Sequence, residues 1–171
     1  MTQFRAFLSL MAFFAFPLLD SAQEMHSTAR TIPAFDQLKA LVGTWIGADS
    51  SGHKIEVTYE LISNGSVLME RLKPGNEPDM ITMYSLEGDR IQVTHYCSAG
   101  NQPTMQTVPS PLFDGKIAFT FMRLSGAKSP DEGHMVGLTV SIPDKNHLTQ
   151  SWTFMEKGKS NTETFTYTRK S

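Results

Sequence analysis

The chain has 171 residues, 40% of them hydrophobic, which is enough for one domain with a core but not for two domains of ordinary size. Its 15 Lys and Arg residues against 17 Asp and Glu residues leave a formal net charge of −2. This balance excludes an overall basic face for nucleic acid and an acidic solvating tail. The single cysteine excludes an intrachain disulfide framework and a zinc site built from several thiolates.

Residues 1–23 have the layout of a secretory signal peptide. Arg5 supplies a positive charge ahead of a 14-residue apolar stretch from Ala6 to Leu19, and small residues follow it. The stretch is shorter than the ~20 apolar residues of a comfortable transmembrane helix. The alternative is a retained N-terminal anchor helix, but the single positive charge and the early Pro17 favour cleavage. We therefore expect an exported protein, periplasmic or extracellular, with no membrane segment once the leader is removed.

Two short segments precede the strands. Residues 24–32 are polar and lack periodicity, so we expect a flexible linker. One short helix is predicted after it, because Pro33 suits a first helical turn and Gly43 supplies a stop. Apolar residues recur in this segment at helical spacing, namely Phe35, Leu38, Leu41 and Val42. A helix this short is marginal by itself, so we expect it to pack against a larger element.

From Thr44 onward the hydrophobic period changes to two, which is typical of half-buried strands. Asn64-Gly65 is a strong hairpin signal within this region. Turn residues divide the rest of the chain into further predicted strands over residues 54–61, 66–72, 80–86, 90–97, 104–108, 116–124, 134–142, 148–155 and 161–169.

Strands joined mostly by tight turns form an antiparallel meander, and about ten of them in ~148 residues are enough to close a barrel. A two-sheet sandwich is the competing architecture. It usually needs long Greek-key crossovers, which only residues 98–115 and 125–133 could supply. The sequence therefore predicts an all-β single domain over residues 33–171. We expect an antiparallel meander closed into a lipocalin-like or fatty-acid-binding-like β-barrel of nine or ten strands, with one short N-terminal helix.

The segment Leu41-Val42-Gly43-Thr44-Trp45, a short helix running into Gly-x-Trp, resembles the opening of lipocalins and their calycin relatives. In those barrels the Trp plugs the closed end and an Arg from the last strand lies across it. Arg169 ends the last predicted strand and stands in the right place for that partner. The resemblance implies structural roles for Trp45 and Arg169, whose cation–π contact would be favourable by ~1–2 kcal/mol when partly desolvated.

A second resemblance covers most of the mature chain. The chain is similar to a widespread group of exported bacterial proteins with a lipocalin-like domain and no established function. That group usually has a second His two residues after the position of His134, where this chain has Val136. The resemblance rests on Gly43-Thr44-Trp45, Met83-Tyr84, Gly88-Asp89-Arg90, Thr94-His95-Tyr96-Cys97, Gly100-Asn101-Gln102-Pro103, Gly133-His134-Met135 and Trp152-Thr153-Phe154.

Three polar side chains are predicted to point into the barrel. Strand alternation places His95 and Cys97 on the apolar face of one strand and His134 on the apolar face of another. If the meander closes, these groups should line one cavity, with Trp152 and Tyr59 nearby. They are therefore the candidate ligand-binding residues.

Several interpretations of His95, Cys97 and His134 remain open. Neutral imidazole and thiolate are good ligands for zinc or copper. The residues could instead hold haem, as related nitrobindin-like barrels do through a histidine, or one His could act as general base with Cys97 as nucleophile. We favour packing or simple ligand contact, because a free Cys is commonly buried as a small hydrophobe.

The loop over residues 98–103 offers one more candidate. Asn101 could contribute to a pocket rim and donate hydrogen bonds to a ligand, or it could satisfy its own turn. The sequence contains no Gly-x-Ser-x-Gly elbow, phosphate loop, His-Glu-x-x-His or Rossmann glycine series. We therefore expect a barrel that binds an apolar or amphipathic small molecule and no nucleic acid. The alternative is a metal- or haem-dependent protein or enzyme built on the two histidines and the cysteine. The sequence identifies neither a cofactor nor an oligomeric state.

Overall fold

The computed structural model describes residues 32–48, 51–74, 77–108, 114–129 and 131–171. The expected leader at 1–23 and the expected linker at 24–32 lie outside these residues, except for Ile32, which is 9% exposed and belongs to the core. Over the described ranges, no helix has the length and apolar character needed to cross a membrane.

The described elements are a short helix, a 3-10 turn and ten strands. In chain order they are α1 (Pro33–Lys39), β1 (Gly43–Ala48), β2 (Lys54–Ile62), the single 3-10 turn η1 (Ser63–Gly65), β3 (Val67–Pro74), β4 (Met80–Glu87), β5 (Arg90–Tyr96), β6 (Gln102–Gln106), β7 (Lys116–Ser125), β8 (His134–Asp144), β9 (His147–Glu156) and β10 (Lys159–Arg169).

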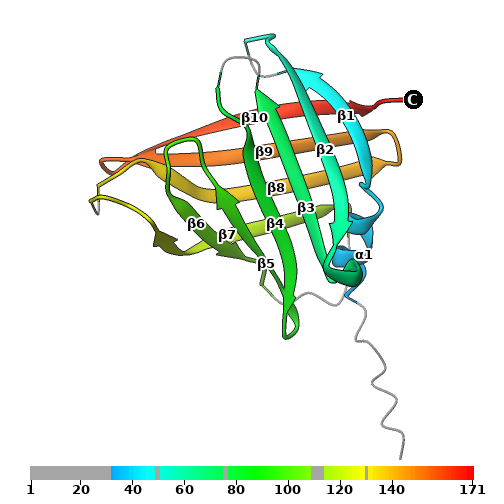
Figure 1. Cartoon of the computed structure of the whole chain (residues 1–171), viewed down its shortest axis with the longest axis horizontal. Helices are drawn as coiled ribbons and strands as arrows, with labels where there is room; N and C mark the ends of the chain where they lie inside the picture. Colours follow the sequence, from blue (N-terminus) through cyan, green and yellow to red (C-terminus); the bar gives the residue numbers. More distant parts are fainter. Residues whose placement is uncertain (1–31, 49–50, 75–76, 109–113, 130) are drawn as a thin grey trace, which may run out of the picture.

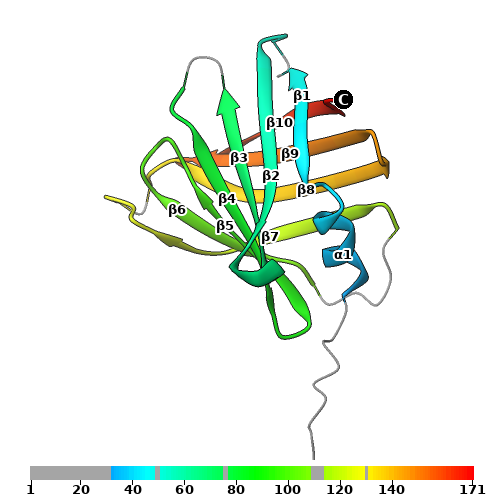
Figure 2. The same ribbon diagram turned by 45° about the vertical axis from the view of Figure 1, so that its right-hand side comes forward.

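The strands form a closed antiparallel barrel. Each strand pairs with the next along the chain, and β1 pairs with β10 to complete the circle, with Trp45 opposite Arg169. Figures 1 and 2 show the strands wrapped around one interior, with α1 at one end of the barrel beside β1. The predicted all-β barrel of nine or ten strands with one short helix is confirmed, and the sandwich alternative is excluded.

The helix is shorter than the sequence predicts. It ends at Lys39, and Gly43 begins β1 with a φ of 126° instead of following the helix as its stop. After Lys39 the chain tightens, since the backbone N–H groups of Leu41 and Val42 donate three residues back, to the carbonyls of Leu38 and Lys39. Arg169 then caps this end with 2.8 Å hydrogen bonds to the carbonyls of Ala40 and Val42.

The first hairpin forms where the sequence predicts it. Asn64 and Gly65 both have positive φ, 56° and 77°, and lie between β2 and β3. The turn after β8 differs, because Pro143 and Asp144 remain in the strand. Asp144 Oδ1 there accepts hydrogen bonds from the backbone N–H groups of Asn146 and His147 at 2.7 and 3.0 Å, which makes residues 145–146 the turn.

The helix-covered end of the barrel is filled by large side chains. Phe35, Leu38 and Leu41 on and after α1 are at most 2% exposed. Trp45 is completely buried, and its Nε1 donates a 2.8 Å hydrogen bond to the carbonyl of Leu41. A short amphipathic helix therefore gains its stability by covering this end of the barrel.

Arg169 fixes the same end from the last strand. Its Cζ lies 4.3 Å from the centroid of the Trp45 ring. Its guanidinium also donates three hydrogen bonds of 2.8 Å, to the backbone carbonyls of Ala40, Val42 and Lys145. One side chain thus joins the segment after α1, the turn between β8 and β9, and the last strand.

Candidate functional site

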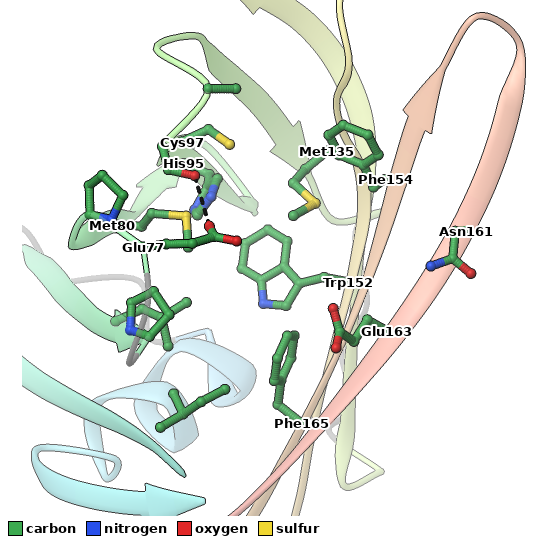
Figure 3. A pocket seen from close by; sticks show the side chains of 16 residues that line it. Glu77, Met80, His95, Cys97, Met135, Trp152, Phe154, Asn161, Glu163 and Phe165 are labelled. Atoms are coloured by element: carbon green, nitrogen blue, oxygen red, sulfur yellow. Dashed lines mark hydrogen bonds between the residues drawn. The ribbon is translucent and has the colours of Figure 1, made fainter. Parts of the chain in front are cut away.

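A cavity of about 620 Å³ lies inside the barrel, and Figure 3 shows the side chains around it. Most of its lining is apolar or aromatic, and the residues come from β2, β3, β4, β5, β8, β9 and β10 and the segments next to them. The lining residues are Ile55, Leu72, Pro74, Glu77, Pro78, Met80, His95, Cys97, Ser98, Ala99, Met135, Trp152, Phe154, Asn161, Glu163 and Phe165.

His95 is the most deeply buried polar residue of this lining, with only 2% of its surface exposed. It lies on β5 directly opposite Thr82 of β4, and its Nδ1 is 2.9 Å from the Thr82 hydroxyl. Its ring packs against Trp152 with the centroids 4.7 Å apart. Burial lowers the pKa of His95 to about 4, so the ring is neutral at pH 7.

The surroundings of His95 also indicate which ring nitrogen carries the proton. Among the described residues, the Thr82 hydroxyl has His95 Nδ1 as its hydrogen-bond partner, and His95 Nε2 is buried without one. A hydroxyl that donates to Nδ1 uses its single proton, whereas a hydroxyl that accepts would leave that proton without an acceptor. The arrangement therefore favours a proton on Nε2, which makes this buried atom a hydrogen-bond donor.

Cys97 and Trp152 line the same cavity as His95. Cys97 follows β5 and is half-buried, and its backbone N–H donates a 3.1 Å hydrogen bond to the Asn101 carbonyl. Trp152 comes from β9 and is 3% exposed. Uninterrupted alternation along β5 and β9 is what brings these three candidate residues together.

His134 does not line the cavity, and the expectation that it shares one with His95 is wrong. A β-bulge in β8 is the cause: Met135 pairs with Phe154 and Gly137 with Thr153, so Val136 is an extra residue. The bulge exchanges the faces, and Met135 lines the cavity in place of His134. The His134 ring instead packs against Phe121 with the centroids 5.1 Å apart, and its Nδ1 lies 2.7 Å from the Glu132 carbonyl oxygen.

This displacement also separates the candidate metal ligands. In the part of the chain that the structure describes, no group of three His, Cys, Asp or Glu side chains is placed to hold one metal ion. His95 and Cys97 share the cavity wall, whereas His134 lies on the other face of β8.

Asn101 lies outside the cavity lining and is completely buried. Its Nδ2 donates hydrogen bonds of 2.9 Å to Glu132 Oε1 and to the carbonyl of Gly133. These bonds join Asn101 to residues that lie 31 and 32 positions later in the chain, so its side chain does not close its own turn. Asn101 therefore ties the loop after β5 to the segment that enters β8.

Tyr59 belongs to a buried polar cluster that the sequence did not reveal. The cluster lies one or two inward positions further along its strands than the cavity lining. Tyr84 donates a 2.6 Å hydrogen bond to Glu70 Oε2, and Gln150 Nε2 donates to the same oxygen at 2.8 Å and to the Tyr59 hydroxyl at 3.0 Å. A signal existed in the alternation, since Glu70 stands between Leu68 and Leu72 on an apolar face.

Burial raises the pKa of the Glu70 carboxyl, against the lowering effect of the hydrogen bonds from Tyr84 and Gln150. Within the described residues, two side-chain oxygens of this cluster have no hydrogen-bond partner: Glu70 Oε1 and Gln150 Oε1. A proton on Glu70 would supply a donor where both oxygens are acceptors. The neutral acid therefore suits this position better than the carboxylate does.

Several cavity residues were also not singled out in the sequence. Phe165 and Glu163 of β10 line the cavity, together with Glu77 from the segment before β4, whereas Phe154 was expected in the aromatic wall and lies there. The faces of β9 and β10 could have been read from alternation, but their position at one cavity depends on how β8, β9 and β10 pair.

Comparisons with known proteins show the fold. No protein-family model matches the chain, and no curated protein matches it. Among solved structures, Rv2717c from M. tuberculosis is similar with a TM-score of 0.58 and 14% sequence identity, over 81% of this chain and 98% of that chain. A protein of unknown function from the DUF3598 family of Nostoc punctiforme PCC 73102 is similar with a TM-score of 0.51 and 16% identity, over 78% of this chain and 49% of that chain. At these identities the likeness extends to the barrel fold alone.

Proposed function

We propose that this protein binds an apolar or amphipathic small molecule inside its barrel. A cavity of about 620 Å³ is within the size range of small-molecule sites, and an apolar wall with a few polar groups is their usual chemistry. The observation that carries the proposal is this cavity with His95 as a buried polar residue of its lining, whose Nε2 has no partner in the described residues. Leaving such a group unpaired costs ~1–3 kcal/mol, which a bound molecule would recover.

We further propose that binding takes place outside the cytoplasm. The support is the sequence of residues 1–23, which has the charge, apolar length and small residues of a cleaved leader. Cell fractionation followed by N-terminal sequencing tests this, because a chain that begins at Met1 and is found in the cytoplasmic fraction would contradict export.

Haem fits this cavity poorly. His95 is the one histidine of the described lining, and the Thr82 contact favours a proton on Nε2, the atom that would have to bind the iron. Among the described residues, the lining contains the carboxylates of Glu77 and Glu163 and neither Lys nor Arg to pair with the haem propionates. We therefore prefer an organic ligand without a metal.

The cysteine of the cavity provides a direct test. Cys97 lies in the lining and is the single cysteine of the sequence, so iodoacetamide reports on access to this site alone. We expect 1-decanol, an uncharged amphipathic probe, to slow alkylation of Cys97 about tenfold when present at roughly ten times its Kd. Mass spectrometry of timed samples measures the rate.

A matched variant controls for effects of decanol on the reagent. Cys97→Ser combined with Thr164→Cys moves the thiol to the outer face of β10, where Thr164 is exposed. Decanol should leave alkylation of this variant unchanged. Equal rates with and without decanol for Cys97, or equal slowing of both thiols, would contradict binding in the cavity.

A further inference from the structure

The charges of the cavity wall already have partners or are absent. Among the described residues the lining contains neither Lys nor Arg, and His95 is neutral at pH 7. The exposed Glu77 accepts a 3.1 Å hydrogen bond from the Ser98 hydroxyl, the dashed line in Figure 3, and Glu163 has an interaction partner of its own. A carboxylate, phosphate or ammonium group entering this space would leave water without a free opposite charge to meet. The wall therefore favours an uncharged ligand.

One wall of the cavity is aromatic. Trp152 and Phe154 stand two positions apart on the inward face of β9, and Phe165 of β10 lies diagonally across from Trp152. Figure 3 shows the three rings on this side of the cavity. Trp152 is 3% exposed, whereas Phe154 and Phe165 are half-buried. The two Phe rings therefore present most of the aromatic surface that a ligand can contact.

Sulfur-containing side chains lie around the same space. Met135 of β8 pairs directly with Phe154 and is also half-buried, while Met80 of β4 and Cys97 after β5 belong to the lining as well. Sulfur atoms and aromatic rings both interact with an aromatic partner more favourably than apolar burial alone provides. A ring placed here gains these contacts, whereas a saturated group of similar size gains burial alone.

We propose that the ligand is an uncharged molecule with an aromatic ring system. The ring lies against Phe154, Phe165 and Met135, and a hydroxyl, carbonyl or ether group on the molecule stays at the exposed side of the cavity, near Ser98 and Asn161. This assignment rests on the proposed binding function and adds the ligand class to it. It excludes fatty acids and other charged amphiphiles as the preferred occupants.

Four probes with one two-ring skeleton separate aromatic character from charge: 2-naphthalenemethanol, its saturated decahydro analogue, 2-naphthoate and 2-naphthalenemethylammonium. We expect isothermal titration calorimetry with the full mature chain at pH 7 to give about tenfold tighter binding of 2-naphthalenemethanol than of either charged probe. It should also bind about threefold more tightly than the decahydro alcohol. The saturated alcohol is the more apolar of the two, so burial alone predicts the opposite order.

The variant Phe165→Leu keeps an apolar side chain at the wall and removes its ring. We expect it to weaken 2-naphthalenemethanol about fivefold while leaving the decahydro alcohol within about twofold. Phe121→Leu is the matched control, because Phe121 is 39% exposed and lies outside the lining. This control should change the affinity of neither alcohol.

The outcomes are distinguishable. If 1-decanol protects Cys97 but the decahydro alcohol binds as tightly as 2-naphthalenemethanol, the aromatic assignment is wrong and the binding function stands. The same conclusion follows if a charged probe binds most tightly, or if Phe165→Leu weakens both alcohols equally. If neither 1-decanol nor any of the four probes binds, the proposed function and the aromatic assignment both fail.

Discussion

His95 links the stability of the barrel to pH through a single imidazole ring. In the folded protein its pKa is lowered to about 4, whereas the unfolded chain protonates near 6.5. The unfolded state therefore binds more protons between these two values, and the free energy of unfolding decreases as the pH falls through this window. The full contribution is ~3 kcal/mol.

Urea denaturation at pH 7.5, 5.5 and 4 measures this effect. We expect His95→Gln to remove most of the loss between pH 6.5 and 4, while His53→Gln, the same change at an exposed position, retains it. A wild-type slope that persists in His95→Gln would show that another group is responsible.

Glu70 has the opposite dependence. Burial raises its folded-state pKa above the ordinary 4.5, so the folded protein holds a proton that the unfolded chain has released. Stability from this group is present at low pH and is lost as the pH rises from 4.5 through the folded-state pKa. The two residues therefore destabilise the barrel at opposite ends of the pH range.

Replacing the Glu70 acid with its neutral amide tests this directly. In Glu70→Gln the side-chain oxygen still accepts from Tyr84 and Gln150, and an uncharged NH₂ group replaces Oε1, which has no partner in the described structure. We expect higher stability than wild type at pH 8 and no gain at pH 4, measured by urea denaturation. Glu70→Ala provides the contrast, because it leaves the Tyr84 hydroxyl and the Gln150 amide without their acceptor. This variant should lower the free energy of unfolding by ~2–5 kcal/mol at both pH values.

At the scale of the elements, β10 packs closely against Gly47 of β1 at the seam between the two strands. A Cβ on Gly47 would overlap the Thr166 carbonyl oxygen, and it would lie 2.5 Å from Tyr167 Cδ1. Both are held by the barrel, so neither can move aside at low cost. We expect Gly47→Ala to destabilise the protein by ~3 kcal/mol, measured as a lower Tm by circular dichroism.

Gly137 in β8 provides the matched control. A Cβ there would be 3.5 Å from Thr153 Cβ, an ordinary contact, so Gly137→Ala should leave the Tm unchanged or slightly raised. If the two alanine variants melt alike, the seam is less tightly packed than its geometry indicates.

Alternation along single strands predicted much of the fold and part of the site. It placed His95 and Trp152 on inward faces because β5 and β9 run without interruption through these positions, and it placed Cys97, which follows β5, at the same cavity. It failed at His134 because the bulge at Val136 arises from pairing between β8 and β9, which no local pattern records.

The polar cluster escaped prediction for a related reason. Glu70 and Gln150 are 80 positions apart, and their contact exists only because the barrel closes. A carboxylate on an apolar strand face was visible in the sequence, but its partner was not. Long-range pairing therefore sets the limit of what the sequence alone could predict for this site.

At the scale of the whole molecule, the interior divides into regions with different tasks. The helix-covered end is packed around Trp45 and held by Arg169, and the buried cluster around Glu70 separates part of that core from the cavity. Exposed residues of the lining, among them Glu77, Ser98 and Asn161, lie away from that packed end. These positions can therefore change with little cost to the fold.

The pairing of β1 with β10 has a consequence for how the barrel is made. The residues joined at this seam lie at the two ends of the domain, and the bond between Arg169 and the Ala40 carbonyl spans 129 positions. A growing chain can assemble the sheet hairpin by hairpin, yet β1 keeps one edge without a partner until the last strand has been synthesised. Until then the sheet has two open edges that can pair with another copy of the chain, so closure is both the slowest contact to form and the step that ends the risk of aggregation.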